Sequence, residues 1–161
     1  DRCNGVPLRP TDAVEETTQT IGVEMETLTT PKPWPKLQVE LREIGGVMVQ
    51  LWPQYYHDAA MLLYVLDVSQ TTQVSGATVE LFHTLGDPAM RDTPTLLLLN
   101  KTDLPSGFSR EQADKLMRLP ELQLRYPHVT VLEGSATTGA GLDEILSWIV
   151  RHHARLQQAT A

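Results

Sequence analysis

From residue 61 onwards, apolar residues form three short runs that predict buried β-strands. The runs lie at residues 61–68, 95–99 and 128–133, and polar or turn-forming residues follow each of them. Strands that are apolar almost throughout, rather than at every second position, are typical of parallel sheets with both faces covered. We therefore predict that the strand at residues 95–99 is buried on both faces, that the strand at residues 61–68 is also fully buried, and that residues 128–133 form a third buried strand.

Segments with helical spacing of apolar residues separate or follow these runs. They cover residues 72–85 and residues 142–156. A further helix is predicted to begin at Ser109, where Gln112 completes a capping-box pattern, and to run to about residue 119. Alternating strands and helices predict right-handed βαβ units. The expected fold class is therefore α/β, with a doubly wound, mostly parallel sheet and helices on both of its faces.

The first half of the chain predicts an antiparallel hairpin at one edge of this sheet. Polar and apolar residues alternate over residues 23–30 and 37–44, and the stiff turn P-K-P-W-P joins the two segments. Residues 47–58 show no clear period and are expected to be irregular or short-helical. Residues 1–19 are polar and aperiodic, which predicts a mobile loop.

Composition and charge narrow the class of protein. A length of 161 residues favours a single domain, and 41% hydrophobic with 20% charged residues is ordinary for a globular chain. The formal net charge of −7 argues against nucleic acid as a partner. No apolar run approaches the roughly 18 residues of a membrane-spanning helix. The single cysteine, Cys3, excludes an internal disulfide. We expect a monomer.

The end of the second buried strand carries the first candidate site. Asn100, Lys101 and Asp103 follow the leucine run in the spacing N-K-x-D, and ligands of parallel α/β sheets bind at the carboxyl ends of the strands. One aspartate carboxylate can accept hydrogen bonds from both N1–H and the N2 amine of guanine. Asp103 would do this, while Asn100 ties the loop together and the stem of Lys101 lies along the base. The alternative reading is a solvated turn after a core strand.

Three further loops that carry sequence motifs are expected at the same edge of the sheet, at residues 20–22, 43–46 and 134–137. The motifs T-I-G-V-E, E-I-G-G, W-P-Q-Y-Y, N-K-T-D-L-P and G-S-A-T-x-G-x-G-L, in this order, make the chain from Thr20 onwards resemble Arf-family small GTPases. The resemblance implies a small GTPase-like fold that binds GTP and GDP, with Mg²⁺ as cofactor. It also implies that the hairpin is the family's interswitch.

The resemblance assigns roles to individual residues. Thr20 matches the switch I threonine, which meets Mg²⁺ and the γ-phosphate, and Gly46 matches the glycine whose backbone N–H reads the γ-phosphate. A side chain at Gly46 would block that close approach. Ser135 and Ala136 match the loop in which a backbone N–H donates to the guanine O6 atom.

The chain departs from the family's pattern at two catalytic positions. Glu43 replaces the aspartate at the entrance to switch II, so its contact with Mg²⁺ is displaced by one methylene. Val47 replaces the glutamine that orients the attacking water, which predicts slow intrinsic hydrolysis. Gln50, three positions later, is an alternative for that role. No catalytic residue is assigned.

The family's aromatic effector patch falls on Val23, Leu41 and Tyr55, so only the tyrosine is aromatic here. Val23 and Leu41 are also explained simply as strand residues that face the core. The resemblance implies protein effectors and regulators that bind the switch and interswitch regions. It further implies a cytoplasmic protein of membrane or ciliary traffic, and leaves open peripheral association with Golgi or ciliary membranes.

No phosphate-loop motif G-x-x-x-x-G-K-[ST] occurs in the sequence, which begins at Asp1. In the family, that loop, its strand and the first helix precede the switch I threonine, and the strand is central in the sheet. We expect these elements to lie upstream of Asp1. The alternative is a pseudo-GTPase, a protein-interaction module that neither binds nor hydrolyses nucleotide.

Other candidate residues carry less chemistry. The five histidines show no metal-ligand spacing. Trp148 is interpreted as a packing residue of the last helix. Asp67, at the end of the first buried strand, is expected to cap the following segment and is given no chemical role.

Overall fold

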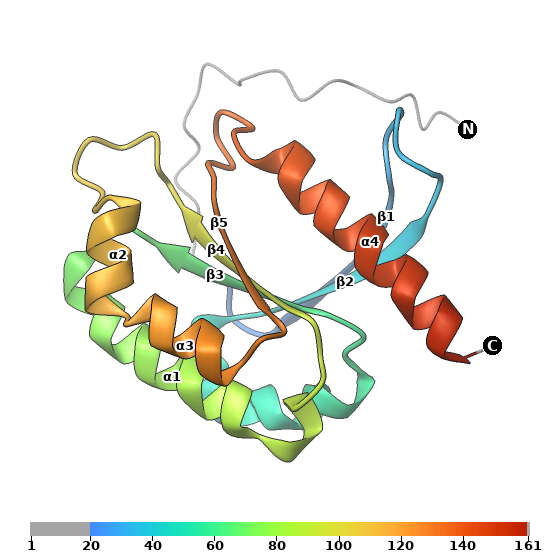
Figure 1. The fold of residues 1–161 in the computed structure, drawn as a ribbon, viewed down its shortest axis with the longest axis horizontal. Helices are drawn as coiled ribbons and strands as arrows, with labels where there is room; N and C mark the ends of the chain where they lie inside the picture. The colour runs from blue at the N-terminus through green and yellow to red at the C-terminus, as the bar shows by residue number, and fades with distance from the viewer. Residues whose placement is uncertain (1–19, 161) are drawn as a thin grey trace. The chain divides into compact units, whose positions relative to one another are not determined.

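The computed structural model describes residues 20–160, and Figure 1 shows the fold of the chain. The predicted loop over residues 1–19 lies outside the described residues. The chain divides into two compact units, which are treated separately below: residues 53–145, and the described residues before and after them. The elements are β1 (Val23–Thr29), β2 (Gln38–Ile44), η1 (Gly46–Asp58), β3 (Leu62–Asp67), η2 (Thr71–Gln73), α1 (Val74–Gly86), η3 (Pro88–Met90), β4 (Thr95–Asn100), α2 (Arg110–Leu116), α3 (Leu119–Arg125), β5 (Val129–Glu133) and α4 (Leu142–Thr160).

Residues 53–145 form a three-stranded parallel sheet in the order β3-β4-β5. The central strand β4 is the core of this unit, because its residues Thr95 to Leu99 are all buried. Each crossover leads to the next strand in the same direction, so right-handed connections place α1 and the pair α2 and α3 on one face of the sheet (Figure 1). The predicted α/β fold class with parallel strands is confirmed.

Strand β3 corrects one prediction, because it is not buried on both faces. Tyr64 and Leu66 are buried, whereas Leu63 and Val65 are 42% and 52% exposed. The physical reason is that β3 is an edge strand of the three-stranded sheet, and only one of its faces is covered in the part of the chain that is described. An apolar run alone could not distinguish this strand from the doubly covered β4.

The helix predicted from Ser109 to about residue 119 is confirmed as α2 but ends at Leu116, and a second helix follows it. The capping box is present, since the Gln112 side chain accepts from the Ser109 N–H and the Ser109 hydroxyl accepts from the Gln112 N–H. The chain then breaks at Arg118, whose φ of 51° is left-handed. A new helix, α3, begins at Leu119, and Pro120 stands in its first turn, where a missing N–H costs no hydrogen bond. Helix α3 was not predicted, because a proline after a helical segment usually indicates its end rather than the first turn of another helix.

The other unit contains the predicted antiparallel hairpin. β1 and β2 pair from Val23 opposite Ile44 to Thr29 opposite Gln38, and they form a sheet of their own. The hairpin is open to solvent: Met25 is 62% exposed and Leu41 is 38% exposed. The expectation that Leu41 faces the core is therefore wrong.

Helix α4 runs over Leu142–Thr160 and carries one fully covered aromatic side chain. Trp148 is 2% exposed, which confirms that it packs. His152 lies on the indole, with ring centroids 4.4 Å apart, and its Nδ1 is 2.8 Å from the Trp148 carbonyl oxygen. Among the described residues, no helix has the length and hydropathy needed to cross a membrane.

Candidate functional site

The loops that follow β4 and β5 are joined by a hydrogen bond. The two strands are parallel neighbours, so their carboxyl ends lie at the same edge of the sheet. There the Ala136 backbone N–H donates to the Asn100 Oδ1 atom over 3.1 Å. The structure therefore brings together Asn100 of the N-K-x-D segment and Ala136 of the S-A segment, two motifs that lie 36 positions apart.

Thr102, the variable position of N-K-T-D, makes a second connection between the same loops. Its backbone N–H and its hydroxyl both donate to the Gly134 carbonyl oxygen, over 3.2 and 2.9 Å. Glycine at position 134 is required by the packing of its own loop, because a Cβ atom there would lie 2.8 Å from the Ala140 carbonyl oxygen. Thr102 was not predicted as a site residue, because the N-K-x-D motif leaves its position open.

The S-A loop is also closed on itself. The Ser135 side chain is buried, and its hydroxyl accepts from the Thr138 N–H over 3.1 Å, while its own N–H donates to the Ala140 carbonyl. Ser135 therefore holds the loop, and its hydroxyl is turned inward rather than toward a ligand.

Lys101 is held by Asp67, a residue for which no chemical role was predicted. Its backbone is left-handed, with φ of 67°, and its ammonium lies 2.8 Å from the Asp67 Oδ2 atom. Asp67 ends β3 directly opposite Asn100 in the parallel register. The ion pair links neighbouring strands through residues 34 positions apart, so no local sequence pattern could have revealed it.

The other carboxylate oxygen of Asp67 makes the expected cap. Its Oδ1 atom accepts from the Ser69 N–H over 2.8 Å and from the Ser69 hydroxyl over 2.6 Å. Burial raises the pKa of the Asp67 carboxyl, but the hydrogen bonds from Lys101 and Ser69 and the charge of Lys101 outweigh it. The pKa of Asp67 therefore lies below its ordinary value, and the carboxylate is charged near neutral pH.

Asp103 differs from Asp67 because its side chain points into solvent. The residue is exposed, and its carboxylate has no hydrogen-bond or ion-pair partner among residues 20–160. Two free carboxylate oxygens beside a braced loop can accept two neighbouring N–H donors, which is the chemistry that a guanine edge requires.

The residues predicted to meet phosphate and metal lie in the other unit. The Thr20 hydroxyl donates to the Glu43 Oε1 atom over 2.5 Å, so the structure brings this pair together. The glycine that permits the contact is Gly45, because a Cβ atom there would meet the Thr20 carbonyl oxygen at 1.9 Å. At Gly46 a Cβ atom would meet nothing within 4 Å. The described residues therefore do not supply the crowding predicted for that position.

The donor set at Thr20 and Glu43 fits Mg²⁺. A hydroxyl that donates its proton to a carboxylate keeps a lone pair for a metal, and both groups offer the hard oxygen ligands that Mg²⁺ prefers. In the described part of the chain, no cluster of three or more His, Cys, Asp or Glu side chains could hold a metal by itself. Mg²⁺ characteristically takes one or two protein oxygens and completes its shell with phosphate and water.

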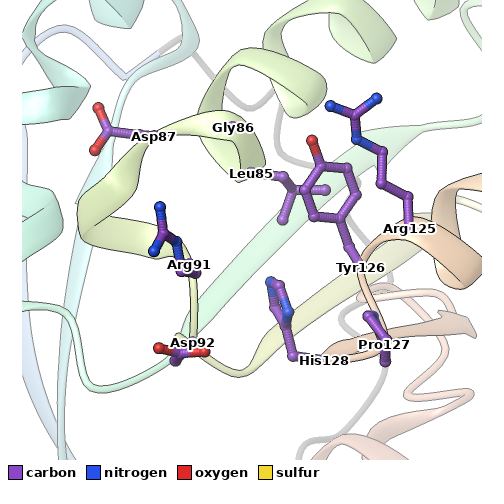
Figure 2. A pocket seen from close by; sticks show the side chains of 9 residues that line it. All are labelled: Leu85, Gly86, Asp87, Arg91, Asp92, Arg125, Tyr126, Pro127 and His128. Carbon is purple, nitrogen blue, oxygen red and sulfur yellow. The ribbon is translucent and has the colours of Figure 1, made fainter.

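A separate cavity of about 370 Å³ lies at the opposite ends of the strands, where β4 and β5 begin (Figure 2). The guanidinium groups of Arg91 and Arg125 and the carboxylates of Asp87 and Asp92 line it. Burial lowers the pKa of His128, against the charge of Asp92, and its Nε2 atom has no hydrogen-bond partner among the described residues. Because positive and negative side chains are equal in number, the lining selects neither an anion nor a cation.

Comparison with known sequences places these observations in a family. A sequence model of the ADP-ribosylation factor family matches residues 8–153. ADP-ribosylation factor-like protein 16 of Homo sapiens is 36% identical over 117 residues, which are 72% of this chain and 59% of that protein. This chain therefore spans about three-fifths of the length of that relative. The run L-W-P-Q-Y-Y and the glutamate before I-G-G also resemble this relative.

A second relative and a solved structure agree. ADP-ribosylation factor-like protein 1 of Saccharomyces cerevisiae is 30% identical over 139 residues, 85% of this chain and 73% of that protein. The structure of the small GTPase Arl6 from Trypanosoma brucei with the nucleotide analogue GppNp is similar with a TM-score of 0.75. It matches 89% of this chain and 86% of that chain at 20% identity, a likeness that shows the fold.

Proposed function

This chain belongs to the ADP-ribosylation factor family and has its small GTPase fold, and we propose that it is a switch protein that binds GTP and GDP with Mg²⁺. The observation that carries the proposal is the hydrogen bond between Asn100 and Ala136. It joins the two loops that would read the guanine base, and it forms within the polypeptide itself. A preformed loop pair loses less conformational entropy on binding.

In the proposed complex Asp103 accepts from guanine N1–H and N2–H, and the stem of Lys101 lies along the base. The O6 atom faces the S-A loop. Because the Ala136 N–H already donates to Asn100, O6 shares this donor with the Asn100 carbonyl oxygen or displaces it. Adenine offers neither the N1–H donor nor the O6 acceptor, so the same loops reject it.

The phosphates and Mg²⁺ are assigned to the other group of residues. Thr20 and Glu43 supply oxygens toward Mg²⁺, and the Gly46 N–H reads the γ-phosphate. Val47 is 55% exposed and its side chain has no donor or acceptor with which to orient a water. Hydrolysis by the protein alone is therefore slow, and a regulator that supplies a polar group accelerates it.

Signalling and location belong to the same proposal. Effectors and regulators bind the switch regions and the exposed hairpin of β1 and β2, which carries apolar side chains at Met25, Leu28 and Leu41. The protein acts in the cytoplasm in membrane or ciliary traffic, with peripheral association at Golgi or ciliary membranes.

The test is a titration of the full-length protein with fluorescent GDP, followed by competition with GTP, GDP and ATP in the presence and absence of Mg²⁺. Saturable binding that GTP and GDP displace and ATP does not is the expected result. Equal displacement by ATP, or no saturable binding, rejects the proposal.

A second candidate function is a pseudo-GTPase that acts only through protein contacts. The observations that favour it are the replacements by Glu43 and Val47 at the positions that handle Mg²⁺ and water. The same titration separates the two functions, since the pseudo-GTPase binds no guanine nucleotide while its hairpin still binds partners.

A further inference from the structure

We propose that Asp67 is a positioning residue for the guanine site: it holds the Lys101 ammonium and thereby keeps the Asp103 carboxylate free to accept from the base. The inference rests on the proposed function, because it assigns a task within the same site. Asp67 does not touch the base and acts through Lys101.

The first argument is the directed chain of contacts from Ser69 to Lys101. Two donors of Ser69 occupy the Oδ1 atom of Asp67, which fixes the orientation of the carboxylate and leaves Oδ2 for the ammonium at 2.8 Å. The ion pair is partly shielded from water, with the side chains of Lys101 and Asp67 44% and 27% exposed. A shielded pair with ordered hydrogen bonds is stronger than an exposed one.

The second argument is the backbone of Lys101. A non-glycine residue with φ of 67° is held in a conformation that isolated chains rarely adopt, so surrounding contacts must maintain it. The Asp67 ion pair is one such contact, and the Thr102 hydrogen bonds to Gly134 are another. Releasing the ammonium therefore loosens the segment that carries the base-reading residues.

The third argument is the position of Asp103 two residues after Lys101. The ammonium of a flexible lysine side chain pairs readily with a carboxylate. Without Asp67, the carboxylate nearest to Lys101 along the chain is that of Asp103. In the structure, Lys101 pairs with Asp67, and Asp103 has no ion-pair partner among residues 20–160. Asp67 thus serves as the competing partner that keeps the base-reading carboxylate unoccupied. Binding specificity often depends on preventing a competing contact, which here is the ion pair between Lys101 and Asp103.

The experiment measures GDP and IDP binding by the full-length protein and by Asp67→Asn. Inosine lacks the N2 amine, so the ratio of GDP to IDP affinity reports how well Asp103 reads the base. Asp67→Asn is expected to lower GDP affinity on the order of tenfold, through faster dissociation, and to lower the GDP to IDP ratio. A purely structural loss would weaken GDP and IDP equally, which overturns the proposal.

A double-mutant cycle with Lys101→Met tests the route of the effect. Methionine keeps an unbranched apolar stem and removes the charge, so Asp67→Asn should cost nothing further in the Lys101→Met background. An equal loss in both backgrounds overturns the proposal. Glu111→Gln is the matched control: it breaks the exposed Lys115–Glu111 pair of 2.7 Å on α2 and should leave both affinities unchanged.

If Asp67→Asn lowers the unfolding temperature too far for binding assays, Ser69→Ala replaces it. This variant leaves the carboxylate in place and removes one of the two donors that orient it, so a loss of about threefold in GDP affinity is expected. A wild-type protein that binds no guanine nucleotide overturns the proposed function together with this inference. A wild type that binds GDP, with Asp67→Asn unchanged from it, overturns this inference alone.

Discussion

The base-reading loops and the Thr20–Glu43 region differ in how firmly the chain holds them. The first follow the buried strand β4 and its neighbour β5, and at least three side-chain hydrogen bonds or ion pairs fix them: Asn100 to Ala136, Thr102 to Gly134 and Lys101 to Asp67. The second joins Thr20, just before the hairpin, to Glu43 in its exposed strand β2. Beside that side-chain bond, it is held by the hydrogen bonds from the Gly45 N–H to Gly22 and from the Trp52 indole to Gly45. Recognition of a planar base needs fixed geometry, whereas a region that changes with the phosphate state of its ligand needs a low barrier to rearrangement.

The largest expected effect contrasts a buried position in β4, below the base-reading loops, with an exposed position in the hairpin. Leu97→Ala removes a fully buried side chain from β4 and should lower the free energy of unfolding by about 2–5 kcal/mol. Met25→Ala, at a 62% exposed position of the hairpin, should change it by less than about 0.5 kcal/mol. Urea denaturation measures both. Similar costs for the two variants would remove the contrast.

The next effect concerns the free carboxylate. Asp103→Ala removes both acceptors for the guanine edge and should lower GDP affinity by on the order of a hundredfold, with loss of preference over ADP. Asp103→Asn is the graded control, since it retains one oxygen acceptor and should fall between wild type and alanine. Competition titration gives these affinities. Unaltered GDP preference in Asp103→Ala would show that the base is read elsewhere.

Two adjacent glycines provide a matched pair in the other region. Gly45→Ala places a Cβ atom against the Thr20 carbonyl oxygen, which must move, so we expect a loss of about 1–3 kcal/mol in stability and separation of Thr20 from Glu43. The Cβ atom of Gly46→Ala meets no atom of residues 20–160 within 4 Å, so this variant should leave the stability of the ligand-free protein unchanged.

Thermal unfolding and the Mg²⁺ dependence of GTP affinity report the difference between these glycines. If Gly46→Ala destabilises the ligand-free protein as much as Gly45→Ala, the assignment of Gly45 as the sterically required glycine is wrong.

The smallest expected effect tests the link between the two base-reading loops. Thr102→Val keeps the shape of the side chain and removes the hydroxyl that donates to Gly134, while the backbone N–H bond remains. A single hydrogen bond of this kind contributes about 1 kcal/mol, so GDP affinity should fall about fivefold. Stopped-flow dissociation of fluorescent GDP measures it. Faster dissociation is the expected sign, and an unchanged rate would mean that the Thr102 hydroxyl is not needed beside the two remaining bonds, from the Thr102 N–H to Gly134 and from the Ala136 N–H to Asn100.

The sequence predicted the parts of the molecule whose cause is local. The leucine run of β4, the alternation of the hairpin and the capping box at Ser109 all depend on residues a few positions apart, and the structure confirms them. The one-sided exposure of β3 depends on what covers the sheet, which its own residues do not encode. The break at Arg118 depends on a left-handed backbone conformation, which glycine or asparagine at this position would have indicated but arginine does not.

The candidate site divides in the same way. The N-K-x-D and S-A motifs, and the candidate residues Thr20 and Glu43, were recognised from the sequence alone. The contacts of Asp67 with Lys101 and of Thr102 with Gly134 join residues more than 30 positions apart across neighbouring loops. The nucleotide and Mg²⁺ roles of the candidate residues remain predictions.

Amide hydrogen exchange of the full-length protein, with and without nucleotide, tests the central claim most directly. If the loops after β4 and β5 read guanine, GDP should slow exchange at residues 100–104 and 134–138, while ADP at the same concentration should leave these amides unchanged. Equal protection by ADP, or protection by GDP that spares both segments, would contradict the account.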